Sequence, residues 1–63
     1  MGAKLVKMIE FAEKEGGAMA KARVVMKSGI SDSKAAAEPD STENIEKLKA
    51  AIKEVVGKDA PGV

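Results

Sequence analysis

The first half of the chain carries a stripe of apolar residues at helical spacing. Its strongest positions recur every seven residues, at Leu5, Ala12, Met19 and Met26. Apolar or small residues occupy the half-steps between them, at Met8, Ile9, Gly16 and Ala22. This spacing places all of these side chains on one face of an α-helix. The pattern therefore predicts helix over residues 4–27.

Two adjacent glycines, Gly16 and Gly17, interrupt this stripe. Glycine weakens a helix because the backbone loses more conformational freedom there than at any other residue. Two arrangements keep the stripe in phase across the pair: one long helix with a soft middle, or two helices folded against each other. A continuous helix favours a hairpin that dimerises, whereas a break favours a compact monomer of three or four short helices.

A stop signal follows the first helical pattern. Gly29 can take the left-handed conformation after a helix, and Ile30 can then fold back on Val25, as in a Schellman motif. Ser31 or Asp32 is positioned to cap a short helical turn. That turn covers residues 32–38, and Pro39 ends it because the residue before a proline disfavours helix.

The second half contains the clearest amphipathic helix, over residues 42–56. Its apolar positions are Ile45, Leu48, Ala51, Ile52, Val55 and Val56. Asp40 and Glu43 have the spacing of a capping box, although Ser41 is an equally suitable cap. Gly57 closes the helix, and residues 58–63 are expected to form a frayed tail.

These elements predict an all-α fold, a small helical hairpin or a three-to-four-helix bundle in a single domain over residues 1–63. Residues 4–27 would pack antiparallel on residues 42–56. A chain of 63 residues buries only roughly 60% of its unfolded surface. Without cysteine or histidine, neither a disulfide nor a zinc site can support so small a core. We therefore expect a homodimer, with a packing face made of Met8, Phe11, Met19, Met26, Leu48, Ile52 and Val55.

The chain lacks the usual catalytic chemistry. Its side chains offer carboxylates, lysines and a few hydroxyls, so we expect no enzyme activity, no catalytic residue, no cofactor and no metal. The acidic pairs Glu10 with Glu13 and Glu43 with Glu46 lie among lysines on outer helix faces. Met8, Met19 and Met26 share one helix edge and could bind copper(I), but burial in a core or a partner groove suits their adaptable side chains better.

Charge and hydropathy limit the partners. The net charge is +1, which gives no overall field toward nucleic acid or an anionic membrane. No apolar run is long enough for a membrane span or a secretory signal, so we expect a cytoplasmic protein without a membrane partner.

Glu15 and Arg23 lie in or beside the apolar arc of the first half. There they either extend to solvent or fix the orientation of two subunits.

Residues 19–37 resemble the helix-turn-helix of bacterial repressors, in which a helix, a Gly-Ile/Val-Ser turn and a recognition helix follow one another. Gly29, Ile30 and Ser31 carry this resemblance, and the segment departs from the family pattern at Val25, Ser28 and Pro39. The resemblance implies binding to duplex DNA. It assigns the contacts with bases and phosphates to Ser31, Asp32, Ser33, Lys34 and Lys27.

Two functional hypotheses follow. The first is a non-enzymatic interaction or regulatory protein that packs its helices against a second copy or against a helical partner. The alternative is a minimal DNA-binding protein of the helix-turn-helix kind. Salt-sensitive binding to duplex DNA distinguishes the second from the first.

Overall fold

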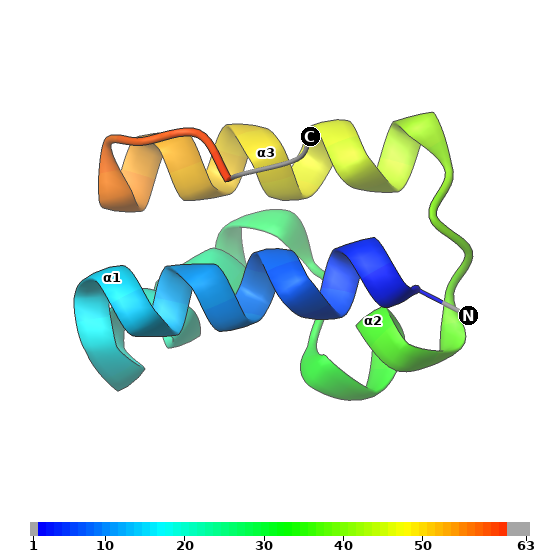
Figure 1. Ribbon diagram of the computed structural model, residues 1–63, viewed down its shortest axis with the longest axis horizontal. Coiled ribbons are helices and arrows are strands. Elements are labelled where there is room, and N and C mark those ends of the chain that lie inside the picture. Colours follow the sequence, from blue (N-terminus) through cyan, green and yellow to red (C-terminus); the bar gives the residue numbers. More distant parts are fainter. Residues whose placement is uncertain (1, 61–63) are drawn as a thin grey trace.

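A computed structural model describes residues 2–60, which form three helices and no strand (Figure 1). Helix α1 covers Ala3–Ser28, α2 covers Asp32–Ala37, and α3 covers Thr42–Val56. The predicted all-α fold class is confirmed. Both α1 and α3 are long enough to present one face to a shared core, whereas α2 is a short connecting helix.

Gly17 breaks α1 into two segments. Its backbone has φ 78° and ψ −172°, a conformation that is essentially restricted to glycine. The N-terminal segment, residues 3–16, and the C-terminal segment, residues 18–28, therefore do not form one straight rod. Of the two arrangements that the glycine pair allows, the structure has the break and the compact bundle.

The N-terminal segment of α1 and helix α3 lie side by side and run in the same direction (Figure 1). At their starts, the backbone N–H groups of Lys4 and Leu5 each donate to the Asp40 carboxylate over 3.2 Å. At their other ends, Lys58 Nζ, just after α3, lies 3.1 Å from Oε1 of Glu15, near the end of the N-terminal segment. The predicted antiparallel packing is thus wrong for this pair. The chain already reverses at Gly17, so a second reversal before α3 restores the original direction.

The C-terminal segment of α1 crosses behind the N-terminal segment (Figure 1) and is joined to α3 and α2 by ion pairs. Lys27 Nζ lies 2.8 Å from Glu54 Oε1 on α3, and Lys21 Nζ lies 2.7 Å from Asp32 Oδ2 on α2. Helix α2 packs on α1 and buries Ala35 completely. Both segments of α1 therefore contact another helix.

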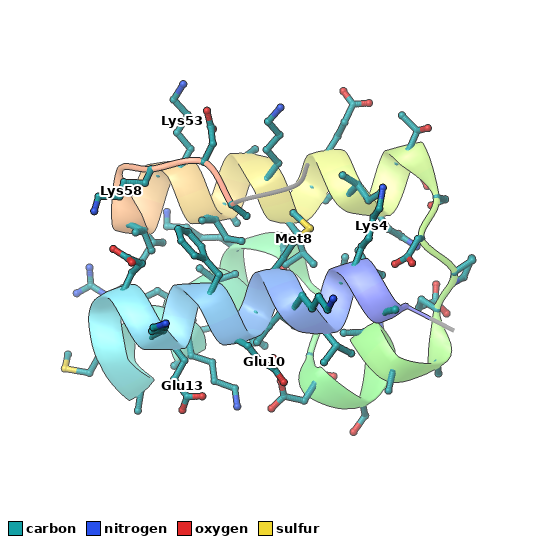
Figure 2. All side chains as sticks on the ribbon, viewed as in Figure 1. Lys4, Met8, Glu10, Glu13, Lys53 and Lys58 are labelled. Atoms are coloured by element: carbon teal, nitrogen blue, oxygen red, sulfur yellow. The ribbon has the colours of Figure 1, made fainter. Side chains whose placement is uncertain are left out.

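The core lies between these elements. Its largest fully buried side chains are Leu5, Met8, Ile9, Val24, Leu48 and Ile52. Figure 2 shows Met8 directed from α1 toward α3, while Glu10 and Glu13 point away from α3. Burying a side chain of this size contributes about 1.5–3 kcal/mol, so the stripe of α3 stabilises the fold through contacts within one chain.

The helix ends are formed by local hydrogen bonds. Ser31 Oγ accepts the N–H of Lys34 over 3.3 Å, and Ser41 Oγ accepts the N–H of Asn44 over 3.2 Å. These serines, rather than Asp32 and Asp40, are the caps. The capping box predicted for Asp40 is not formed, because its carboxylate is directed to the start of α1 instead.

The end of α1 has the predicted left-handed glycine, but not a full Schellman motif. Gly29 has φ 74° and donates its N–H to the carbonyl of Val25 over 2.9 Å. The N–H of Ile30 donates to Ser28 Oγ over 3.1 Å. In a Schellman motif it would donate to the carbonyl of Val25 instead. Ile30 itself is buried, so this turn directs a side chain into the core.

The segment after α3 returns to the core as far as it is described. Ala60 is only 4% exposed, and Lys58 contacts Glu15. The prediction of a frayed tail is therefore wrong over residues 58–60. Residues 61–63, the rest of that predicted tail, lie outside the described residues.

Candidate partner-binding surface

The C-terminal segment of α1 has an inner face and an outer face, both apolar. Ala20 and Val24 are buried against the rest of the molecule. Successive residues of a helix are separated by about 100°, so the residues opposite these two must face away from the core. The segment thus carries more apolar surface than one side of contact can bury.

The outer face consists of Ala18, Met19, Ala22, Val25 and Met26. Met19 is 73% exposed and Met26 is 82% exposed. Ala18 and Ala22 are also exposed, and Val25 is half-buried. At helical spacing these five positions span an arc of about 120°, as wide as the stripe by which a helix normally joins a core. This is an apolar helix face without a covering element among residues 2–60.

Three cations lie beside the outer face. Lys21 pairs with Asp32 and Lys27 pairs with Glu54. The hydrogen bond to Asp32 raises the pKa of the Lys21 ammonium above its ordinary value of 10.5. Arg23 is exposed, and within residues 2–60 it forms no ion pair. Of these three cations, Arg23, the only arginine of the chain, is therefore the one without a carboxylate partner among residues 2–60.

The structure divides the predicted packing face into two groups. Met8, Leu48 and Ile52 are buried in the core, and Phe11 and Val55 pack at its edge. The prediction that Met19 and Met26 lie on the same inner face as Met8 is wrong. Their seven-residue spacing keeps phase only along an unbroken helix, and the break at Gly17 turns Ala20 and Val24 inward in their place.

The residues assigned to DNA contact by the helix-turn-helix resemblance are engaged mainly in local structure. Ser31 caps α2, Asp32 pairs with Lys21, and Lys27 pairs with Glu54. Only Ser33 and Lys34 are exposed without such a contact. The helix that would read bases, α2, has six residues, a length of about 9 Å.

The other candidate groups do not form an enclosed site. The pairs Glu10 with Glu13 and Glu43 with Glu46 are all exposed. Among residues 2–60, no three histidine, cysteine, aspartate or glutamate side chains gather as a metal site would require. Since Met8 is buried while Met19 and Met26 are exposed, the three thioethers are not brought together for copper(I).

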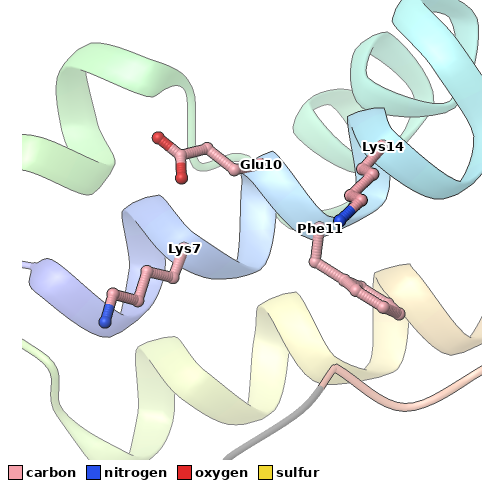
Figure 3. A pocket seen from close by; sticks show the side chains of 4 residues that line it. All are labelled: Lys7, Glu10, Phe11 and Lys14. Atoms are coloured by element: carbon pink, nitrogen blue, oxygen red, sulfur yellow. The ribbon is translucent and has the colours of Figure 1, made fainter.

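An open hollow of about 370 Å³ lies beside Phe11 and is lined by Lys7, Glu10, Phe11 and Lys14. Figure 3 shows the Phe11 ring directed toward α3, with the charged side chains around it on the same helix. All four residues come from two turns of α1. A hollow of this kind exposes its charged groups to water, so it offers no shielded environment in which a carboxylate would become a strong general base.

The sequence contained a signal for one of two structural features and none for the other. The excess of apolar surface on this segment had a signal, because Val24 and Val25 add apolar positions to the stripe of Met19, Ala22 and Met26. Nothing in that pattern indicated that Val24 would be buried and the two methionines exposed. No pattern indicated that Asp40 would accept the N–H groups of Lys4 and Leu5, because that contact joins residues far apart in the chain.

Comparisons with protein-family models, with curated proteins and with solved structures found no match. Within residues 2–60, no helix has both the length and the apolar character needed to cross a membrane.

Proposed function

We propose that this chain is a small non-enzymatic interaction protein, with a regulatory rather than a catalytic role. It acts by packing the outer face of α1 against a helix of a second copy or of another protein. The observation that carries this proposal is the exposure of Met19 and Met26, at 73% and 82%, on a face with no covering element in the described structure.

The composition of the outer face supports the proposal. Methionine and arginine are enriched in protein interfaces, whereas lysine, glutamate and alanine are depleted, so the support comes from Met19, Met26 and the adjacent Arg23. Methionine side chains also adapt to irregular partner surfaces because they are unbranched and polarizable. Ala18 and Ala22 leave room beside the methionines, so a second helix can approach closely.

Site-specific photo-crosslinking in the native cells tests this function. A photoreactive amino acid replaces Met26 in one variant and Glu46, an exposed residue of α3, in a matched control. We expect protein adducts from position 26 that the added substitution Met19→Glu abolishes, because it places a charge on the same apolar face. Equal adducts from both positions would contradict the proposal.

DNA binding is the second candidate function. It is favoured by one observation, the run from a helix through left-handed Gly29 into the capped helix α2. An electrophoretic shift with duplex DNA at low salt tests it, and DNA binding predicts an affinity that falls steeply as salt rises. Our leading proposal predicts no shift, since Lys21 and Lys27 are each paired with a carboxylate.

A further inference from the structure

We infer that the outer face of α1 binds a helix that carries carboxylates opposite Arg23, and that this helix belongs to a different protein rather than to a second copy. The inference rests on the proposed function and names the partner of the same face. It is carried by the position and the charge of Arg23.

Arg23 lies between the two exposed methionines along the helix, four residues after Met19 and three before Met26. Residues with these separations are neighbours on a helix surface. A helix that covers both methionines therefore also approaches the guanidinium group. Removing that charge from water is costly unless the partner supplies an acceptor. A carboxylate matches the planar guanidinium with two parallel hydrogen bonds.

A second copy does not supply this acceptor through the same face. Contact between two copies about a two-fold axis uses the same patch on both. The outer face is centred on Ala22, and an antiparallel pair of helices about such an axis places Arg23 on the same side of the contact as the same arginine of the second copy. Residues 16–31 contain no acidic residue, and the adjacent Asp32 and Glu54 already pair with Lys21 and Lys27.

The size of the face also favours a partner that adds contacts of its own. Residues 18–26 extend about 13 Å along the helix axis. A stable interface usually buries about 800 Å² on each partner, which is more than one short helix face provides. The partner helix is therefore expected to belong to a larger protein whose neighbouring elements add contacts around it, while Met19 and Met26 are the apolar anchors on this side.

Two synthetic helical peptides test the charge preference. Each has about 20 residues, long enough for stable helix in water, and an identical leucine stripe. One peptide has only glutamate beside the stripe and the other only lysine. Methyl NMR of the methionines measures binding, and the buried Met8 reports whether the core stays intact. We expect the glutamate peptide to shift Met19 and Met26 but not Met8, with an affinity at least about tenfold higher than that of the lysine peptide.

Charge reversal at Arg23 provides the matching variant. Arg23→Glu should reverse the preference, so that the lysine peptide binds more tightly by a similar factor. Lys47→Glu is the control, because it makes the same change in net charge at an exposed position on α3. The control should keep the preference for the glutamate peptide.

The outcomes separate this inference from the proposed function. Equal binding of both peptides, or an unchanged preference in Arg23→Glu, overturns the acidic partner while the interaction face stands. Sedimentation as a dimer that Met26→Glu dissociates overturns it in favour of a second copy. If neither peptide shifts Met19 or Met26 at millimolar concentration, the acidic helical partner is overturned, whereas the proposed function is overturned separately, by equal photo-adducts from positions 26 and 46.

Discussion

Met8 and Met19 are the same type of residue on the same helix, yet one is 1% exposed and the other 73%. Hydropathy cannot distinguish them, because each continues the same apolar stripe. The difference comes from the backbone of Gly17, which lies between them and changes the direction of the helix. At the scale of single residues, the local conformation of one glycine therefore decides which methionine is core and which is surface.

Substitution by alanine measures this difference directly. Met8→Ala should lower the free energy of unfolding by about 2–5 kcal/mol, because it leaves a cavity in the core. Met19→Ala should change it by no more than about 0.5 kcal/mol, as is usual for exposed positions. Urea denaturation of both variants gives the comparison, and equal losses would show that the two side chains share one environment.

Gly17 can be tested with the two enantiomers of alanine in a chemically synthesised chain. L-alanine should cost about 1–3 kcal/mol of stability through backbone strain; a Cβ in the L position meets no atom within 4 Å, so a steric clash is not the cause. D-alanine should be tolerated, because the mirror image of the Gly17 conformation is ordinary extended backbone. Similar destabilisation by both enantiomers would contradict the backbone explanation.

At the scale of helices, the start of α1 depends on Asp40, a residue that is distant in sequence but adjacent in space. Gly2 precedes α1 and provides no side-chain cap, whereas the Asp40 carboxylate accepts the N–H groups of Lys4 and Leu5. A negative charge at this end also interacts favourably with the helix dipole. One carboxylate thus caps α1 and fixes it beside the start of α3.

Removal of the Asp40 carboxylate should destabilise the start of α1 and its contact with the segment before α3. Asp40→Ala should lower the free energy of unfolding by about 1–2 kcal/mol, the usual cost of losing a helix cap. Glu38→Ala is the matched control, because Glu38 is exposed and its side chain makes no hydrogen bond in the described structure. Hydrogen exchange should speed up at Lys4 and Leu5 in Asp40→Ala only; unchanged exchange there would rule out this cap.

The ion pair between α1 and α2 predicts a dependence on high pH. The hydrogen bond to Asp32 raises the pKa of Lys21 above 10.5 in the folded protein. A raised pKa contributes stability below the unfolded value and loses it as the pH rises through the folded value. Between about pH 9 and pH 12, wild type should therefore lose more stability than Lys21→Met in urea titrations. An identical loss in the two proteins would contradict this contribution.

At the scale of the whole molecule, the core is closed by one chain. Leu5, Ile9, Leu48 and Ile52 are each at most 1% exposed without a second copy. The homodimer expected from the small size of the chain stays a prediction; the structure shows that folding α1 back at Gly17 already covers these side chains within one chain. The outer face is apolar surface in addition to this core.

This arrangement predicts that folding does not depend on association. The midpoint of thermal unfolding should stay constant over a hundredfold range of protein concentration, because mass action shifts it only when folding and association are coupled. The outer-face variant Met26→Glu should melt close to wild type. A midpoint that rises with concentration in wild type but not in this variant would mean that the outer face contributes to the fold.

Apart from the break at Gly17 and the start of α1, the sequence by itself determined the helices and their ends, because these depend on residues close together in the chain. Serine caps, the glycine after α1 and the stripe of α3 are local signals, and the structure has α3 over Thr42–Val56. Tertiary structure alone decided the parallel packing of α1 with α3, the capping of α1 by Asp40, and the exposure of Met19 and Met26. The physical reason is that both a bent and a straight α1 satisfy the apolar pattern. Only the packing energy of the complete core selects the positive φ of Gly17, and with it the surface that remains for a partner.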